Sequence, residues 1–153
     1  MNINIRRALP EDADILSKIA FSAKAHWDYS KHLMEMWKPQ LTFSDDYFIE
    51  HESWTVELDG EPIAFYTLEE RDRNAWMENL WVSPEHMGKG IGKQLFLDAL
   101  SRSRSSGYLI LRLEADPNAA GFYKKMGMYK VGESSRPIDE DPSRVLPVME
   151  IKL

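Results

Sequence analysis

The sequence predicts a mixed α/β, α+β-like domain with a central mixed, mostly antiparallel sheet of about six to seven strands, flanked by about four helices. Three observations support this prediction: an alternating segment at the N-terminus, a strand–turn–strand pattern in the middle, and alternating helical and apolar segments after residue 90. No linker rich in Gly, Ser or Pro divides the chain. We therefore expect residues 1–153 to form a single domain.

The first half of the chain begins with a predicted strand and continues with helices. Asn2–Arg6 alternates polar and apolar residues, and a helix is predicted from Pro10, where proline and acidic residues suit a first turn. Short helices are predicted around residues 33–37 and 47–49. Three strands follow, at 53–58, 62–68 and 75–82, and Asp59-Gly60 forms a tight turn between the first two.

The second half alternates helices and strands. Helical spacing of apolar residues predicts a helix over 90–104, and the apolar run at 108–113 predicts a buried strand. Asp116 and Pro117 begin a helix that is predicted to continue through Met126. Strands are predicted at 128–131 and 146–153, and the polar tract 132–143 is interpreted as a long loop.

Composition excludes several classes of protein. The 19 Lys and Arg residues against 25 Asp and Glu give a net charge of −6, which argues against a broad nucleic-acid-binding surface. Without cysteine there is no disulfide, Cys-based zinc site or iron–sulfur cluster. The scattered His32, His51 and His86 suggest no metal site. No apolar run is long enough for a signal peptide or a membrane span, so we expect a cytoplasmic protein without membrane partners.

A glycine-rich loop carries the strongest local chemistry. It joins a predicted strand to a predicted helix and reads Met87, Gly88, Lys89, Gly90, Ile91, Gly92, Lys93. Glycines let main-chain N–H groups approach a ligand, and a helix start favours a phosphate or pyrophosphate. Alternatively, the segment is an ordinary turn with a helix cap. The spacing matches neither a dinucleotide fingerprint nor a P-loop, because Lys93 and Gln94 stand where those motifs need glycine and Ser or Thr.

With its downstream segment, the loop resembles a known superfamily. Glu78–Gly127 is similar to the acetyl-CoA-binding half of the GCN5-related N-acetyltransferases (GNAT): a strand, a [QR]-x-x-G-x-[GA] loop, a helix, a strand, and an Asn-containing helix with an aromatic pair. Phe122 and Tyr123 supply that pair, four and five residues after Asn118. The resemblance implies an enzyme that moves an acetyl group from acetyl-CoA to a primary amine of a small molecule or protein, by direct attack in a ternary complex. Met87 departs from the family pattern, which has Gln or Arg there.

The resemblance also implies roles for individual residues. Met87–Lys93 would hold the pyrophosphate, the main chain of Leu80 and Val82 would bind the pantetheine arm, and Asn118 would contact the cofactor arm. Tyr123 would be the general acid that protonates the departing thiolate, and Glu78 the base that accepts the proton of the amine. The alternatives are structural: Leu80, Val82 and Tyr123 as core residues, Asn118 as part of a helix start, and Glu78 as an exposed or substrate-binding acid.

The acceptor is expected near the segment after the first long helix. His26 and Tyr29 are candidate substrate-binding residues, and the alternative is a packed aromatic turn, which we expect for Trp27. Exposed C-terminal strand edges favour pairing into a homodimer. Two other functions stay open. One is a non-catalytic acyl-CoA-binding or sensor module of the same fold, and the other is a nucleotide binder that shares only the glycine loop.

Overall fold

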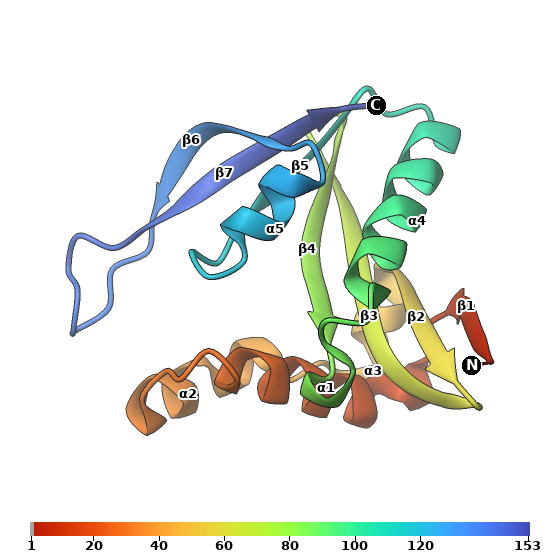
Figure 1. Cartoon of the computed structure of the whole chain (residues 1–153), viewed down its shortest axis with the longest axis horizontal. Coiled ribbons are helices and arrows are strands. Elements are labelled where there is room, and N and C mark those ends of the chain that lie inside the picture. Colours follow the sequence, from red (N-terminus) through yellow and green to blue (C-terminus); the bar gives the residue numbers. More distant parts are fainter. Residues whose placement is uncertain (1) are drawn as a thin grey trace. The chain divides into compact units, whose positions relative to one another are not determined.

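The computed structural model describes residues 2–153, which contain one seven-stranded sheet in the order β1-β2-β3-β4-β5-β7-β6 (Figure 1). The pairs β1–β2, β2–β3, β5–β7 and β6–β7 are antiparallel, and β4–β5 is parallel, as expected for a mixed sheet. The strands are β1 Ile3–Arg7, β2 Glu52–Leu58, β3 Glu61–Arg71, β4 Asn74–Val82, β5 Ile110–Glu114, β6 Tyr129–Ser135 and β7 Val145–Lys152.

Residues 2–153 contain five α-helices, whereas about four were predicted. They are α1 Ala13–Ala25, α2 Lys31–Trp37, α3 Asp45–Glu50, α4 Ile91–Ser105 and α5 Ala120–Lys125. Serine side chains begin the two short helices. Ser30 Oγ accepts from the amide of Leu33 at the start of α2, and Ser44 Oγ accepts from the amide of Tyr47 at the start of α3.

The described chain forms two compact units. The first contains residues 2–69 and Asn79–Ala99, and the second contains Glu70–Glu78 and Leu100–Leu153. Strand β4 and helix α4 each continue from one unit into the other. Each unit has its own buried residues, and we describe the two in turn.

In the first unit, strand β3 lies between two helical layers. Phe65 is fully buried and meets the ring of Phe43 edge to face, 5.6 Å between centroids, on the side of α3. Tyr66, the next residue, points to the other side, where its hydroxyl donates to Asp98 Oδ2 of α4 at 2.6 Å. This alternation is that of a strand covered on both faces. The predicted tight turn before β3 is confirmed, with φ of 51° at Asp59 and 86° at Gly60.

In the second unit, charged residues form a row across the strands. Arg112 of β5 faces Glu150 of β7, and Glu150 faces Tyr129 of β6 in the strand registers. Arg112 Nε donates to Glu150 Oε2 at 2.6 Å, and the Tyr129 hydroxyl donates to Glu150 Oε1 at 3.2 Å. Cross-strand pairs of this kind help to fix the register. The buried side of the same strands carries Leu111, Leu113 and Met149.

In the C-terminal half, several helices and strands begin or end at other residues than predicted. Strand β6 continues through Ser135, so the expected long loop over 132–143 is shorter than predicted. The polar end of β6 is held by pairing with β7 and by Glu114, which accepts hydrogen bonds from Ser134 and Arg136. Helix α5 begins at Ala120 rather than at Asp116, because residues 117–119 form a turn. Strand β5 begins at Ile110, and Leu109 is 76% exposed.

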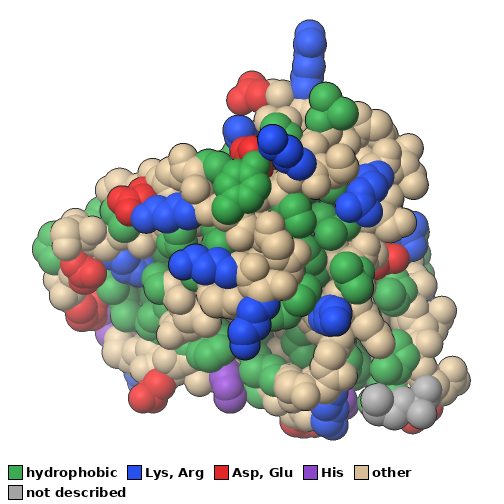
Figure 2. Space-filling model, turned by 45° about the horizontal axis from the view of Figure 1, so that its top comes forward, with side chains coloured by type: hydrophobic (Ala, Val, Ile, Leu, Met, Phe, Trp, Pro, Cys, Tyr) green, Lys and Arg blue, Asp and Glu red, His purple; other side chains and the backbone are tan. Residues whose placement is uncertain are grey.

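The distribution of charged side chains on the surface of the described residues agrees with the net charge of −6. On the face shown in Figure 2, Lys and Arg side chains are scattered, some of them beside Asp or Glu side chains, and they form no single continuous basic surface. Across residues 2–153, no helix combines the length and apolar character needed to cross a bilayer.

Candidate active site

The glycine loop is open and contains two residues in the left-handed region. Gly88 has φ of 76° and Gly90 has φ of 81°, and no heavy atom lies within 4 Å of a Cβ built at either position. A side chain at these positions would be strained in any surroundings. The loop follows a 3-10 turn at Pro84–His86, and both Lys89 and Lys93 are exposed.

Helix α4 begins directly after the loop. The amide of Gln94 donates to the carbonyl oxygen of Gly90 at 3.1 Å, which makes Ile91 the first helical residue. The first N–H groups of any helix have no partner within the helix and lie at its positive end. Ile91 is buried and Gly92 is half-buried. The helix start therefore fits an anion that the glycines leave room to approach.

Leu80 and Val82, at the end of β4, are only half-buried. They are therefore not among the fully buried residues of the core, and their role in binding stays a prediction. The parallel ladder between β4 and β5 joins Ala75 to Leu111 and Trp76 to Arg112, ahead of this stretch of β4. Glu78 is an exposed residue although its side chain is only 23% exposed, so its main chain contributes much of that exposure.

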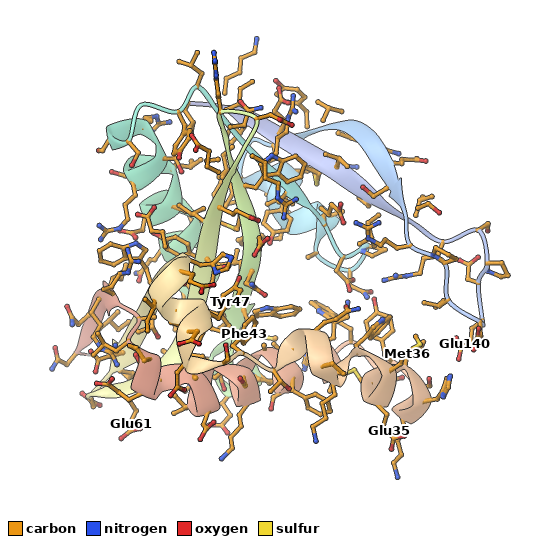
Figure 3. All side chains as sticks on the ribbon, turned by 180° about the vertical axis from the view of Figure 1, so that it is seen from behind. Glu35, Met36, Phe43, Tyr47, Glu61 and Glu140 are labelled. Carbon is orange, nitrogen blue, oxygen red and sulfur yellow. The ribbon has the colours of Figure 1, made fainter. Side chains whose placement is uncertain are left out.

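A hydrogen-bonded cluster anchors this end of β4 in the first unit. The side-chain amide of Asn79 donates to the hydroxyl of Tyr47 at 3.1 Å and to Oγ1 of Thr67 at 3.0 Å. Its carbonyl oxygen accepts from the indole N–H of Trp81 at 2.9 Å. Tyr47 stands beside Phe43, as Figure 3 shows, with ring centroids 4.9 Å apart. Sequence reasoning missed this cluster, because it joins three segments of the chain.

Glu78 is paired with a cation. Arg71 Nη2 donates to Glu78 Oε1 at 2.7 Å. The Arg71 guanidinium also lies over the Trp76 ring, 4.8 Å from its centroid. The carboxylate is thus held by a cation that is itself stacked on an aromatic ring. Arg71 is a further residue of this region that the sequence pattern did not single out.

Tyr123 is deeply placed on α5 in the second unit. It is 8% exposed, whereas the neighbouring Phe122 is half-buried. Burial raises the pKa of Tyr123 well above its ordinary value, and the negative charge of Asp116 adds to this shift. The hydroxyl therefore keeps its proton throughout the neutral range.

Asn118 lies in the turn that precedes α5. Its main-chain N–H and its side-chain amide both donate to Asp116 Oδ1, at 2.8 and 3.0 Å. Asn118 is exposed. Asp116 thus fixes the side chain of Asn118 in the turn before α5, outside the first turn of that helix.

The structure places His26 and Tyr29 in different surroundings. His26 is exposed at the end of α1, with its ring edge to face with Trp27 at 5.3 Å. Trp27 is 38% exposed, so the prediction that it packs inside the helical layer is wrong. Tyr29 turns instead toward Trp37, with ring centroids 4.8 Å apart, and Lys24 Nζ lies over both rings.

Two further observations concern ionisable side chains. His86 Nδ1, one residue before the glycine loop, is buried and has no hydrogen-bond partner. Among residues 2–153, no group of three or more His, Asp or Glu side chains is arranged to hold a metal ion.

Comparison with known proteins identifies the family. The sequence profile of the Acetyltransferase (GNAT) family matches residues 20–128. A peptidyl-lysine N-acetyltransferase, YjaB of Salmonella typhimurium, is 32% identical over 136 residues, covering 88% of each chain. A 5-NmdU N-acetyltransferase of Pseudomonas phage PaMx11 is 26% identical, covering 86% of this chain and 91% of its own.

Solved structures agree on the fold. A GCN5-related N-acetyltransferase from Rhodopseudomonas palustris superposes with a TM-score of 0.83 at 24% identity, covering all of this chain and 97% of its own. The PaiA N-acetyltransferase from Thermoplasma acidophilum, solved in complex with coenzyme A, gives 0.79 at 24% identity and covers 100% of both chains. The profile match extends over more than half of the sequence, and the chain therefore belongs to the GNAT family of acetyltransferases.

Proposed function

We propose that this acetyltransferase is a single-domain cytoplasmic enzyme that moves the acetyl group of acetyl-CoA to a primary amine of a small molecule or protein, by direct attack in a ternary complex. The observation that carries the proposal is the loop before α4, where Gly88 and Gly90 adopt positive φ with open space around them. The continuity of β4 and α4 through both compact units supports one domain.

The loop suits the diphosphate of coenzyme A. Main-chain N–H groups of residues 87–93 are the proposed donors, and the positive end of α4 adds to the attraction. Binding by main-chain N–H groups does not depend on the side chain at position 87. Met87 therefore removes only the side-chain contact that Gln or Arg would make and leaves the main-chain hydrogen bonds. The exposed Lys89 and Lys93 supply positive charge to the same segment.

The pantetheine arm is assigned to the end of β4. The half-buried Leu80 and Val82 follow the short ladder with β5, so their peptide groups are proposed to bind the arm as an added strand would. Asn118, whose side chain Asp116 orients, is proposed to contact the cofactor arm.

The chemical roles are assigned to Tyr123 and Glu78. When bound, acetyl-CoA supplies an activated acetyl thioester. Tyr123 holds a proton on its hydroxyl at neutral pH and is the proposed general acid. Glu78 is the proposed base for the amine, whose ordinary pKa of about 10.4 keeps it mostly protonated. Arg71 orients the Glu78 carboxylate through its hydrogen bond.

The similarity to a peptidyl-lysine N-acetyltransferase supports an amine acceptor. Two measurements test the proposal. Calorimetry with coenzyme A should show binding by the folded protein, and acetyl-CoA with a panel of amines should yield acetylated product. Absence of binding at millimolar coenzyme A would overturn the proposal, whereas binding without transfer to any amine would leave only an acyl-CoA-binding module.

A further inference from the structure

A buried nitrogen atom without a partner lies directly before the glycine loop. His86 is half-buried, and within residues 2–153 its Nδ1 is enclosed by protein and makes no hydrogen bond. Buried side-chain nitrogens usually have a partner, so this exception needs a physical reason. Because Nδ1 is bonded to Cγ, it stays beside the main chain of its own residue in any rotamer. That main chain leads directly into Met87 and Gly88.

The turn that follows His86 has the backbone of a type II turn. Met87 has φ of −66° and ψ of 150°, and Gly88 has φ of 76°. The central residues of a type II turn have φ and ψ of about −60° and 120°, followed by φ of about 80°. His86 is anchored to the sheet, because its amide donates to the carbonyl of Ser83 at 2.8 Å, and the amide of Ser83 donates to Ile63 of β3 at 2.8 Å. The peptide group between Met87 and Gly88 is therefore the part of this turn that can rotate.

A type I turn differs from a type II turn by the rotation of that one peptide group. The rotation brings ψ of the first central residue to about −30° and φ of the second to about −90°, and it reverses the N–H between them. Gly88 accepts either sign of φ. An Asn or Asp that begins a type I turn accepts a hydrogen bond from the N–H two residues later. Nδ1 of His86 has the same place in its side chain as asparagine Oδ1, and it is an acceptor when the ring proton is on Nε2.

We propose that His86 is a positioning residue for the glycine loop, which exchanges between these two turns. In the turn that the structure shows, the N–H of Gly88 makes no hydrogen bond with Nδ1 and serves the diphosphate of coenzyme A. In the rotated turn, the same N–H donates to Nδ1 and is lost to the ligand. The inference rests on the proposed function of the loop and adds the residue that regulates it. His86 therefore lowers the apparent affinity for coenzyme A by the fraction of molecules in the rotated turn.

The first test is the affinity for coenzyme A, measured by calorimetry. His86→Phe keeps an aromatic ring and removes Nδ1, so it should bind coenzyme A roughly 2- to 10-fold more tightly, the range given by one net hydrogen bond. His86→Asn restores an acceptor at the δ position and should show no gain. His32→Phe makes the same substitution at an exposed histidine of α2 and is the matched control. A merely structural role for His86 predicts weaker binding instead.

Hydrogen exchange tests the contact without any ligand. In the free unaltered protein the amide proton of Gly88 should be protected, and it should exchange faster in His86→Phe. Gly88→Ala should protect the amide at position 88 further, because alanine favours the negative φ of the rotated turn. A readout without any variant is the nitrogen NMR signal of His86 Nδ1, which should move when coenzyme A binds and the N–H of Gly88 turns away.

The outcomes separate this inference from the proposed function. Equal affinity for coenzyme A in His86→Phe and the unaltered protein would overturn the inference and leave the loop with its proposed function. Equal exchange of the Gly88 amide in the two proteins would overturn it as well. Failure of every protein to bind coenzyme A would overturn the proposed function. A Gly88 amide that is released in His86→Phe would even then support the contact with His86.

Discussion

Asn79 of β4 donates a hydrogen bond to the hydroxyl oxygen of Tyr47 of α3 across 3.1 Å. The same side chain accepts from Trp81 and donates to Thr67, so it ties β4 to both β3 and α3. Leu80 lies between the two β4 members of this cluster. Asn79 therefore fixes the path of the strand where its peptide groups are proposed to meet the pantetheine arm.

Asn79→Ala should lower stability and weaken cofactor use together. The substitution removes three hydrogen bonds, made with the half-buried Tyr47 and Trp81 and with the fully buried Thr67, for a loss of about 1–3 kcal/mol. We expect the KM for acetyl-CoA to rise. Thr55→Val removes one buried hydrogen bond, to the carbonyl of Ala64, without touching the cluster. It should lower stability and leave the KM unchanged, and an equal KM change in both variants would contradict the assignment.

Gly88→Ala and Gly90→Ala should weaken coenzyme A binding. Both residues have positive φ, where a Cβ costs about 1–2 kcal/mol. Gly107, with φ of 88° and equally open surroundings, ends α4 rather than preceding it. Gly107→Ala should therefore cost similar stability in urea unfolding while calorimetry shows unchanged affinity for coenzyme A. Loss of affinity in all three variants would indicate a general effect of unfolding.

Tyr123→Phe should reduce turnover while the protein remains folded. The same residue should govern alkaline stability, because burial raises its pKa above the unfolded value of about 10. Its contribution is complete below that pH and is lost as the pH rises toward the folded-state pKa. Unfolding followed from pH 8 to 11.5 should show a shallower alkaline decline in Tyr123→Phe. An unchanged turnover would exclude the acid role.

Asp12 should govern stability in acid. Burial raises the pKa of Asp12, but two hydrogen bonds from Arg6, one from the Leu9 amide and the guanidinium charge outweigh it, so the pKa lies below its ordinary value. The contribution is present above about pH 4 and is lost as the pH falls through the folded-state pKa. Asp12→Asn should cost about 1.5–3 kcal/mol at pH 7 and flatten the acid limb. Asp14→Asn, at an exposed position of α1, should change neither.

Glu78→Gln should remove the low-pH limb of the rate profile. The amide cannot accept the proton of the amine, and it keeps an oxygen for the hydrogen bond from Arg71. Glu85, an exposed acid in the 3-10 turn before the loop, provides the control Glu85→Gln. A limb that persists in Glu78→Gln would remove this residue from the mechanism.

Local patterns predicted most of the elements. The Asp59-Gly60 turn, the helix after Gly90 and the apolar strand around Leu111 each follow from neighbours in the sequence, and the structure confirms them. The polar end of β6 could not be predicted in this way. Glu133–Ser135 carries no apolar alternation, and the strand forms there because β7 pairs with it and Glu114 binds Ser134.

In the candidate site, too, the sequence indicated some features and gave no signal for others. The glycine loop is a contiguous motif, so the sequence alone indicated its backbone conformation. The Asn79 cluster and the contact of Lys24 with the Tyr29 and Trp37 rings were missed, because both depend on side chains brought together by tertiary packing. Glu78 was singled out, but its neighbour Arg71 comes from the end of another strand and gave no local signal.

The exposed main chain at Glu78 and the open glycines before α4 have an evolutionary consequence. A peptide group is identical in every residue, so natural selection can exchange the side chains around it while the hydrogen-bonding atoms persist. Under the proposed main-chain binding, a substitution at Met87 leaves these hydrogen-bonding atoms in place, whereas one at Gly88 or Gly90 changes the backbone turn. Proteins of low sequence identity can in this way bind the same ligand through the same main-chain groups.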